Sequence, residues 1–423
     1  MLPELRKNIM ERKPNIILIL ADDMGYGDAG CYDGKHLQTP AIDSLANRGL
    51  RFTDFHSNAP VCSPTRAALL TGRYQQRCGI EGVISARNHR EKGLSPENIT
   101  FADLLKTGGY RTAIFGKWHL GHEPRFNPRY QGFDEFTGFV SGNIDYHSHI
   151  DQVGFEDWWK DVNLAPEEGY STDLITSHGI SFIQQNKDKP FCLYLAHECP
   201  HYPYQGPNDS ADRTIGKPDP ILGRRQDRIA AYKEMMEAMD TGIDRIVREI
   251  NSLGLEQETF IFFCSDNGPA GPGSSGKLKG KKGSLWEGGH RVPGIACWPG
   301  KIRPGTVTNE TALTMDLLPT LASIARLTLP TTLKLDGVDL LNLMVEEKPL
   351  SERPLFWRFK NDCVIRRGPW KLIHNKSQSL YHLDTDIGET TNIIQKEPKQ
   401  GKRLEQELIK WSHKISEGIE QQS

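Results

Sequence analysis

Short, continuously apolar segments alternate along the chain with stretches in which apolar residues recur at helical spacing. Asn15–Ala21 is apolar on both faces, which is typical of a buried strand in a parallel sheet. The pattern returns in three later segments, residues 111–115, 191–196 and 259–264. Helical spacing precedes each of these, over residues 100–106, 173–185 and 229–253. The alternation predicts an α/β fold in which helices flank a central, mainly parallel sheet.

The pattern changes after residue 345. Four short segments of alternating polar and apolar residues follow, at 355–359, 363–366, 370–374 and 380–382. They are typical of an antiparallel meander, and a helical pattern over residues 402–415 comes after them. We therefore expect a large domain over residues 1–345 and a small C-terminal subdomain, an antiparallel sheet with a helix, over residues 346–423.

The charge balance argues against whole classes of partner. Lys and Arg total 52 against 54 Asp and Glu, a formal net charge of −2, so we expect no nucleic acid or anionic membrane surface as a partner. No apolar stretch approaches the roughly 20 residues that a membrane span requires. Eight cysteines in 423 residues are too few for a disulfide scaffold.

The opening residues, 1–14, are charged and lack the apolar core of a signal peptide. From the sequence as written we expect a cytoplasmic protein, or a periplasmic or secreted one if a leader has been removed. No pattern along the chain indicates an oligomeric state.

Oxygen-bearing side chains follow two of the predicted strands. Asp22 and Asp23 come directly after the first strand, and Asp266 and Asn267 come after residues 259–264. Ligands gather beyond the carboxyl ends of parallel strands, so these side chains are expected to converge. Three carboxylates and an amide oxygen suit a hard divalent cation, Ca²⁺ or Mg²⁺. Taken singly, each pair also fits a simple loop cap or turn.

The segment C-S-P-T-R, residues 62–66, stands at the predicted start of a helix. Ser63 and Pro64 fit the N-cap and the first helical position, which places Cys62 at a helix N-terminus, where anions are favoured. Arg66 lies one turn further on and can face the same point. Two other interpretations of Cys62 are open: a buried structural cysteine, or a thiolate nucleophile whose pKa the helix end lowers.

Basic side chains cluster after predicted strands. Lys117 and His119 follow one apolar segment, and His197 and His201 follow another. A further group precedes W-E-G-G: Lys279, Lys281 and Lys282. Singly, each fits a solvated surface charge or a histidine with satisfied hydrogen bonds. Together with a metal at one edge of the sheet, they are the arrangement expected for a tetrahedral dianion ester.

These motifs resemble those of the type I, formylglycine-dependent sulfatases of the alkaline phosphatase superfamily. C-S-P-T-R is similar to the family signature C-x-P-x-R, with Thr65 where Ser is commoner. Further blocks are similar in the same order: G-K-W-H-L-G at 116–121, P-H-Y-P at 200–203, S-D-N-G at 265–268 and W-E-G-G-H-R-V-P at 286–293. A C-terminal block at 380–389 is similar too, so the likeness covers nearly the whole chain. It implies an alkaline-phosphatase-like fold.

The resemblance implies that a formylglycine-generating enzyme converts Cys62 to formylglycine, whose aldehyde hydrate is the nucleophile. It implies one Ca²⁺, rather than Mg²⁺, with these ligands: Asp22, Asp23, residue 62, Asp266 and Asn267. An ordinary serine ester would need attack by water. The second hydroxyl group of a hydrate can instead be deprotonated to expel sulfate.

The resemblance also assigns roles to three cations. Arg66 would hold the hydrate, and Lys117 and Lys282 would bind the sulfate group. Lys282 is chosen over the lysines beside it because it stands five residues before Glu287, which is the spacing of the family.

Three histidines receive roles in the same way. His119 would be the base that breaks down the sulfated intermediate. His201 would be the acid that protonates the departing alcohol. His197 would contact the substrate.

We therefore expect a sulfuric ester hydrolase acting on a carbohydrate sulfate, with sulfated galactose or N-acetylgalactosamine in a poly- or oligosaccharide as the favoured substrate. Within the same fold, the alternative is a phosphodiesterase or phosphonate monoester hydrolase. From another class, the alternative is a non-catalytic protein that binds sulfated sugars.

The long loops are where substrate contacts are expected. Residues 141–170 and 205–225 show no regular pattern, and loops of this length are usually functional or disordered. The predicted substrate contacts are Ser141, Tyr146, His147 and His197. Together with Tyr146 and His147, the side chains of His149, Trp158 and Trp159 could stack on sugar rings, although both tryptophans also fit burial against the core.

Overall fold

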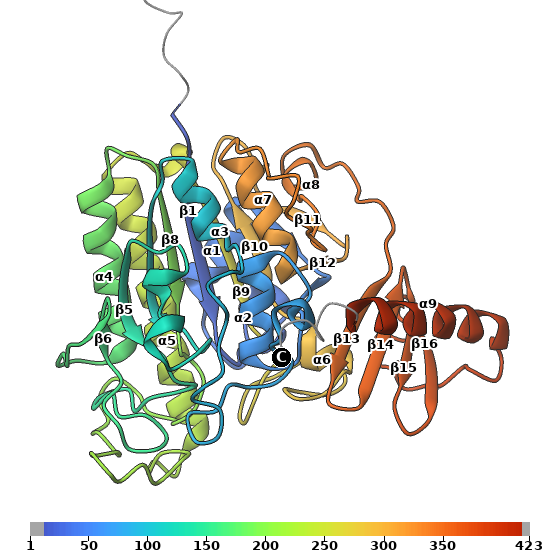
Figure 1. Cartoon of the computed structure of the whole chain (residues 1–423), viewed down its shortest axis with the longest axis horizontal. Coiled ribbons are helices and arrows are strands. Elements are labelled where there is room, and N and C mark those ends of the chain that lie inside the picture. Colours follow the sequence, from blue (N-terminus) through green and yellow to red (C-terminus); the bar gives the residue numbers. More distant parts are fainter. Residues whose placement is uncertain (1–11, 417–423) are drawn as a thin grey trace, which may run out of the picture.

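A ten-stranded sheet forms the centre of the protein in a computed structural model that describes residues 12–416 (Figure 1). Residues 1–11 lie outside this range, so the expectation about a signal peptide falls mostly on residues that the structure does not describe. The strand order is β11 (Thr306–Thr308), β2 (Leu50–Phe52), β10 (Gly294–Cys297), β9 (Thr259–Ser265), β1 (Asn15–Ala21), β8 (Phe191–Ala196), β4 (Arg111–Lys117), β5 (Glu135–Phe139), β6 (Trp159–Lys160) and β7 (Asn163–Leu164). The strands from β9 to β5 run parallel, so their carboxyl ends share one edge. The predicted mainly parallel sheet is confirmed.

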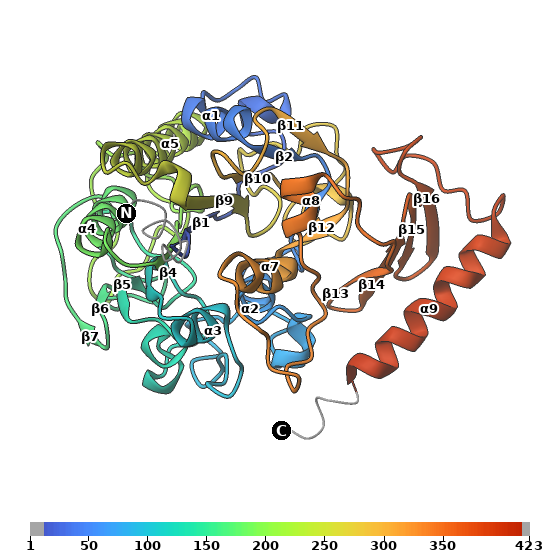
Figure 2. The same cartoon turned by 90° about the horizontal axis from the view of Figure 1, so that it is seen from above.

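Helices cover both faces of this sheet (Figure 2). One face carries α1 (Pro40–Arg48), α4 (Ser171–Asn186) and α5 (Arg228–Ser252). The other carries α2 (Cys62–Thr71), α3 (Phe101–Thr107), α7 (Leu317–Ile324) and α8 (Leu341–Glu346). Successive side chains of β1 enter the two cores in turn, Ile17 and Ile19 on one face, Leu18 and Leu20 on the other. Burial on both faces is why β1 is apolar from Ile16 to Ala21.

Shorter elements complete the large domain. β3 (Phe55–His56) and β12 (Ala312–Leu313) form a separate parallel pair, and α6 (Glu287–His290) precedes β10. Side chains fix some of the helix starts. Thr100 caps α3 and shares a capping box with Asp103, and Asp227 caps α5 by accepting from the backbone N of Ala230.

A four-stranded antiparallel sheet and a helix form the C-terminal part, as predicted. The elements are β13 (Leu355–Phe359), β14 (Asp362–Arg367), β15 (Trp370–His374), β16 (Gln378–His382) and α9 (Pro398–Ser416). Helix α9 lies across one face of the sheet, where Trp411 stacks on Phe356 with ring centres 4.8 Å apart. Figure 1 shows this part beside the central sheet. The domain division at residue 345 stays a prediction.

A buried ion-pair cluster joins the C-terminal sheet to the large domain. Lys371 of β15 is fully buried, and its Nζ lies 2.9 Å from Glu287 Oε1 and 2.8 Å from Glu389 Oε1. Both carboxylates are fully buried as well. Glu389 Oε2 also accepts a hydrogen bond from the backbone N of Glu287 at 2.7 Å. The cluster therefore holds α6, and the loop before it, against the C-terminal sheet.

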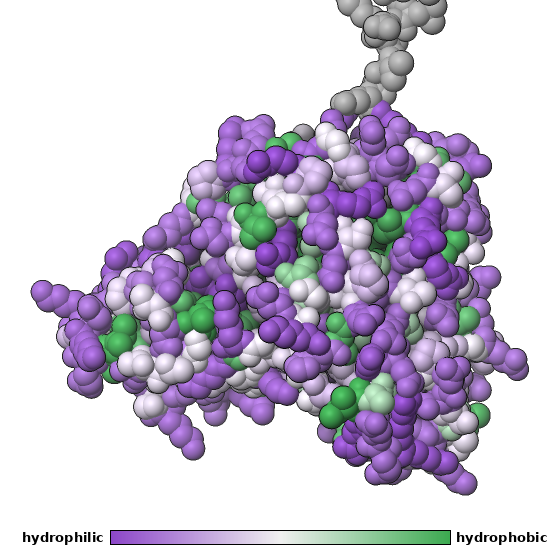
Figure 3. Space-filling view, turned by 180° about the vertical axis from the view of Figure 1, so that it is seen from behind, coloured by the Kyte–Doolittle hydropathy of each residue, from purple (hydrophilic) through white to green (hydrophobic). Residues whose placement is uncertain are grey.

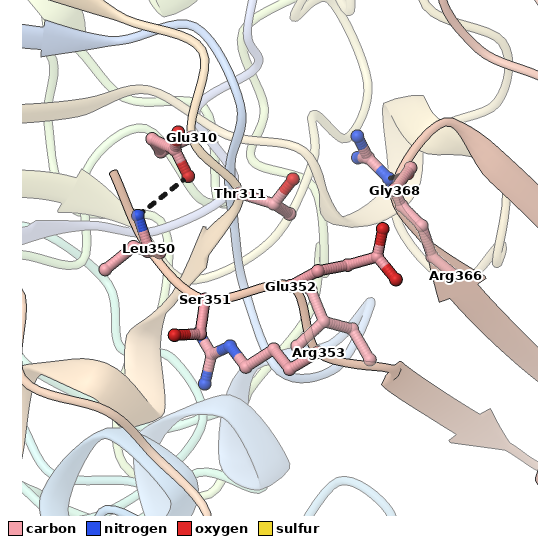
Figure 4. Close-up of a pocket in the computed structure, with 9 residues that line it drawn as sticks. Glu310, Thr311, Leu350, Ser351, Glu352, Arg353, Arg366 and Gly368 are labelled. Atoms are coloured by element: carbon pink, nitrogen blue, oxygen red, sulfur yellow. Dashed lines mark hydrogen bonds between the residues drawn. The ribbon is translucent and has the colours of Figure 1, made fainter. Parts of the chain in front are cut away.

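A pocket of about 150 Å³ opens at the same junction (Figure 4). Its lining residues are Glu310, Thr311, Leu350, Ser351, Glu352, Arg353, Leu355, Arg366 and Gly368. Both arginines are already engaged by buried acids, Arg353 by Asp316 and Arg366 by Asp54. The pocket is therefore part of the packing between the two sheets, with its cations neutralised.

Polar side chains dominate the face shown in Figure 3, and hydrophobic residues lie there in small separate groups. Such scattered groups are normal on a protein surface. Among the helices that the structure describes, none is long and apolar enough to cross a membrane.

Candidate active site

The predicted ligand residues meet at the carboxyl-end edge of the sheet. β1 pairs with β9 so that Ala21 lies opposite Ser265, and the residues that follow each strand therefore leave the sheet side by side. The side chains of Asp22, Asp23, Asp266 and Asn267 are all buried. Asp23 N donates to Asp266 Oδ1 at 3.3 Å, and Asn267 Nδ2 donates to Asp23 Oδ1 at 2.7 Å. The two strand ends thus form one cluster of oxygens.

Cys62 is the first residue of α2, and the predicted helix start was wrong in detail. Val61, in extended conformation, is the N-cap, and α2 begins before Ser63 and Pro64. Ser63 does not cap the helix because its Oγ accepts a hydrogen bond from the backbone N of Ile84 at 3.0 Å. Cys62 nevertheless lies at a helix N-terminus, as expected.

The surroundings of the Cys62 thiol are buried and charged. Its Sγ lies 3.5 Å from Asp22 Oδ1 and 3.5 Å from Lys282 Nζ. Burial, and after it the charge of Asp22, raises the pKa of Cys62 to about 12. A thiolate nucleophile requires the opposite shift, so this environment does not favour the thiolate interpretation.

Arg66 and Lys117 hold the acids of the cluster together. Arg66 Nη2 donates to Asp22 Oδ2 at 3.1 Å and to Asp266 Oδ2 at 3.0 Å. Lys117, the last residue of β4, donates to the same oxygen of Asp22. Burial alone would raise the pKa of Asp22, but the charges of Lys117 and Arg66 hold it below its usual range. Asp22 is therefore ionised.

Lys282 is the lysine of its group that reaches the cluster. Its Nζ lies 2.6 Å from Asp23 Oδ1. Lys279 Nζ instead donates to the backbone O of Glu389, and Lys281 Nζ donates to backbone carbonyls of the loop around residue 272. The geometry distinguishes three lysines that the sequence presents almost side by side.

His119 is confined on two sides. It adopts a left-handed backbone conformation (φ 57°), and its Nε2 lies 3.1 Å from the backbone O of Ile84. A Cβ at Gly142 would stand 2.8 Å from the same ring nitrogen, so glycine is required there. Burial, and after it the charge of Lys117, holds the pKa of His119 well below its usual range. Its Nδ1 is buried and has no hydrogen-bond partner in the described part of the chain.

His201 and His197 lie after β8, and both are buried. His201 Nε2 is 3.7 Å from Asp23 Oδ2, and its Nδ1 is 2.6 Å from the backbone O of Tyr202. Burial, followed by the charge of Lys282, lowers the pKa of His201 to about 4. Burial alone lowers the pKa of His197 to about 4. His201 faces the acids, whereas nothing in the described contacts links His197 to them.

The donor set fits a hard divalent cation. Ligand atoms on four side chains lie within 4.8 Å of one another: Asp22, Asp23, Cys62 and His201. Asp23 Oδ2 and Asn267 Oδ1 are buried and have no hydrogen-bond partner among residues 12–416. Leaving such atoms unpaired is costly, and a cation would satisfy both. Asp266 is not in this group; its Oδ2 accepts from Arg66 and its Oδ1 accepts from the backbone N of Asp23.

A second group of ligand-type residues, His56, Glu287 and His290, lies at the junction with the C-terminal sheet. Glu287 is already paired with Lys371 at 2.9 Å and with Arg366 at 3.6 Å. The Nδ1 atoms of the two histidines are 2.9 Å apart. This group is therefore an ion-pair network of the interior.

The aromatic side chains of residues 141–170 do not form the predicted platform together. Tyr146 is 0% exposed and stacks on Tyr170, with ring centres 5.3 Å apart. Trp158 is 1% exposed and stacks on His149 at 4.5 Å, which matches the alternative of burial against the core. Trp159 is half-buried. Tyr146 and Trp158, buried in this way, do not present a ring face at the surface.

Two other predicted contacts lie in the same loop. Ser141 is buried, and its Oγ donates to the backbone O of Asn143 at 3.0 Å. His147 is half-buried, and its Nε2 lies 3.1 Å from the backbone O of Gly206, which joins the two long loops. Their contact with substrate stays a prediction.

Comparison with known proteins settles the family. A family model described as Sulfatase matches residues 14–327. The chain belongs to the sulfatase family. This sulfatase is 36% identical to arylsulfatase A of Homo sapiens over 410 residues, which cover 88% of this chain and 77% of the relative. It is 35% identical to the N-acetylgalactosamine-6-sulfatase of Canis lupus familiaris over 380 residues, covering 83% and 69%.

A solved structure agrees with the fold. Ps i-CgsB, in complex with k-i-k-neocarrahexaose, matches the sulfatase with a TM-score of 0.85 and 30% identity, covering 95% of this chain and 93% of that one. The expected fold class and family are confirmed, and the protein is a sulfuric ester hydrolase.

Sequence reasoning missed Tyr202 of this sulfatase. Its ring centre lies 4.2 Å from that of His201, and the side chain is half-buried. The block P-H-Y-P contains it, so a signal was present. The confinement of His119 by Ile84 and Gly142 had no comparable signal, because it depends on contacts between distant loops.

Proposed function

We propose that this sulfatase removes sulfate from a galactose or N-acetylgalactosamine unit of a carbohydrate, with Cys62 converted to formylglycine beside one Ca²⁺. One observation carries the proposal: residue 62 lies 3.5 Å from both an acid, Asp22, and a cation, Lys282, inside a buried cluster of oxygens. Relatives named N-acetylgalactosamine-6-sulfatase support the choice of sugar.

The metal would be held by Asp22, Asp23, Asp266 and Asn267 together with residue 62. When bound, Ca²⁺ would supply Lewis-acid stabilisation of negative charge on the oxygens that face it. The unpartnered oxygens of Asp23 and Asn267 support this assignment. Formylglycine, as its hydrate, would supply two hydroxyl groups on one carbon.

The cations would bind and orient the sulfate group. Burial disfavours charge on Lys117 and Lys282, but Asp22 and Asp23 outweigh it and raise the pKa of both lysines, so both stay protonated. Charge that builds on the sulfuryl oxygens during the reaction is then met by fixed positive charge. Arg66 would orient residue 62, because Asp22 and Asp266 hold its guanidinium in place.

The two histidines would move protons. His201 would donate to the leaving oxygen, and His119 would accept a proton near residue 62 once the alcohol has left. Burial keeps the pKa of His201 at about 4. The negative charge of a bound sulfate ester would raise that pKa toward the range of a general acid.

The test is release of sulfate from sulfated galactose and N-acetylgalactosamine oligosaccharides, measured beside a phosphodiester assay. The chain is produced together with a formylglycine-generating enzyme, and Cys62→Ala serves as the matched control. We expect sulfate release that the control lacks, and a peptide containing residue 62 that is lighter than the thiol form by about 18 Da.

Other results would point elsewhere. Preference for the phosphodiester would favour the phosphodiesterase alternative. Binding of sulfated sugar without turnover would favour a non-catalytic protein. Full activity with an unmodified Cys62 would refute the formylglycine mechanism.

A further inference from the structure

A basic loop, residues 85–93, lies beside the active site. It carries Arg87, Arg90 and Lys92 against one acid, Glu91, and all four side chains are exposed. Other arginines nearby are neutralised, as Arg125 is by Glu123 at 2.8 Å. In the part of the chain that the structure describes, no ion pair engages the three cations of the basic loop. Unpaired positive charge is thus concentrated here in a chain whose net charge is −2.

Both ends of the basic loop are fastened to active-site residues. Just before it, Ile84 N donates to the Oγ of Ser63, the residue after Cys62, at 3.0 Å. The backbone O of Ile84 is the group that contacts His119 Nε2 at 3.1 Å. At the other end, Gly93 pairs with Gly121, two residues after His119. The backbone of the loop is therefore held, at both of its ends, in a defined position relative to the reacting groups.

The basic loop is also ordered internally. The backbone N of His89 donates to Ser85 O at 2.9 Å, and that of Lys92 donates to His89 O at 3.1 Å. Arg125 Nη2 donates to the backbone O of Glu91 at 3.3 Å. A loop held by its own turns presents its side chains at low cost in conformational entropy.

Arg90 is the cation whose position is best defined. Its guanidinium carbon lies 5.4 Å from the centre of the Phe155 ring, which comes from the long loop 141–170 and is 59% exposed. Burial, and to a smaller extent the charge of Arg90, lowers the pKa of His122 to about 4. Both ring nitrogens of His122 are buried and have no hydrogen-bond partner among the described residues. A guanidinium held against a ring keeps its N–H groups free for bidentate contact with an oxyanion.

We propose that the basic loop binds an anionic group, a sulfate or a carboxylate, on a sugar residue next to the one that loses its sulfate. Arg87 is three residues beyond Ile84, at most about 10 Å of chain, so an adjacent sugar is within reach. The substrate class is then a glycan with anionic groups on neighbouring residues. This inference rests on the proposed function, because both anions belong to one carbohydrate.

The experiment compares two triple variants. Arg87→Gln/Arg90→Gln/Lys92→Gln removes the charges of the basic loop. Lys399→Gln/Lys402→Gln/Lys410→Gln removes three exposed charges from α9 and is the matched control. Values of kcat/KM are measured at low and high salt on nitrophenyl sulfate, on a monosulfated disaccharide, and on oligosaccharides whose neighbouring residue carries a sulfate or a carboxylate.

We expect the basic-loop variant to lose about tenfold in kcat/KM on the multiply anionic oligosaccharides, mainly through KM, and the loss to shrink as salt rises. Nitrophenyl sulfate and the monosulfated disaccharide should change less than about twofold, and the control should change on none of them. A loss with only one of the two oligosaccharides supports the site and identifies its anion. Equal losses on nitrophenyl sulfate, or an equal loss in the control, would overturn the proposal.

A binding measurement separates this proposal from the proposed function. Calorimetry on a Cys62→Ala chain requires no turnover, so it reports on the basic loop even if sulfate release fails. Arg90→Gln should weaken binding of the multiply anionic oligosaccharide several-fold, and Arg90→Lys should recover part of it. Unchanged affinity in both variants would overturn the proposal.

Discussion

Replacing Lys371 by methionine tests the buried charges that join the C-terminal sheet to the large domain. The Lys371 ammonium is shared by Glu287 and Glu389, at 2.9 and 2.8 Å, and all three side chains are fully buried. Methionine keeps the length of the side chain but removes its charge. Glu287 retains Arg291 at 3.2 Å, whereas Glu389 has no other cation described in contact with its carboxylate.

The expected loss is large because a buried carboxylate would be left without its partner. Removing one member of a buried ion pair costs about 3–5 kcal/mol, against a total stability of about 5–15 kcal/mol. The free energy of unfolding, from urea titrations followed by tryptophan fluorescence, should fall by that amount at pH 7. Lys410→Met, an exposed site on α9, should stay within about 0.5 kcal/mol of wild type.

The pH dependence of this loss makes the test sharper. Burial raises the pKa of Glu389, and Lys371 is the main charge opposing that rise. The folded-state pKa of Glu389 is already raised in wild type, and without Lys371 it rises further above the unfolded value. The folded variant therefore takes up more protons than folded wild type does, and it gains more stability as the pH falls. The deficit of Lys371→Met should therefore be smaller at pH 5 than at pH 7, and Glu389→Gln should restore about 1–3 kcal/mol at pH 7. A deficit below about 1 kcal/mol, or one equal at both pH values, would refute the reasoning.

Three further predictions concern the active site. Asp266→Ala should lose Ca²⁺ and sulfate release together, as metal analysis and assay would show; stoichiometric zinc in fully active wild type would contradict the choice of metal. His201→Ala should slow sugar sulfates by about 10²–10⁴-fold but nitrophenyl sulfate less, since a phenolate needs little protonation, whereas His119→Ala should give a burst and then slow turnover. Equal slowing of both substrates by His201→Ala would place the acid elsewhere. Between pH 7 and pH 5 the free energy of unfolding should fall by about 2 kcal/mol less in His197→Gln than in wild type. The pKa of His197 is about 4 when folded and about 6.5 when unfolded, so as the pH falls the unfolded wild-type chain takes up the proton first. An equal change of the urea midpoint between pH 7 and pH 5 in the two proteins would contradict this.

The centre of the sheet could be predicted because both of its faces are covered. β1, β8 and β9 are apolar without interruption, and β9 differs from its predicted range by one residue. The edge strand β11 and its neighbour β2 are three residues long, too short to show a period. β5 contains Glu135 and Gly138 within five residues, and neither residue type favours a strand. Its pairing with β4 comes from the tertiary fold.

The active site could be predicted where residue type and position along a strand sufficed. Asp22 and Asp266 follow neighbouring strands, which brings them together whatever the rest of the fold does. Burial of Trp158 was one of two expected alternatives, and the sequence could not decide between them; the burial of Tyr146 could not be predicted, because loop segments have no period from which to infer an inward face. Their partners, Tyr170 and His149, are set by how the loop closes on itself.

The separation of the active-site residues along the chain also determines when the cluster can form during translation. Asn267 contacts Asp23 across 244 residues, so the cluster cannot close until β9 has been made. In the finished fold every residue of α2 is buried, Cys62 included, and no other enzyme can reach it there. At about 5–20 residues per second, the roughly 200 residues between Cys62 and Asp266 take about 10–40 s to emerge from a ribosome. The proposed conversion of Cys62 would therefore have to be completed in that interval, and slower translation or delayed folding should then raise the fraction of chains that carry the modification.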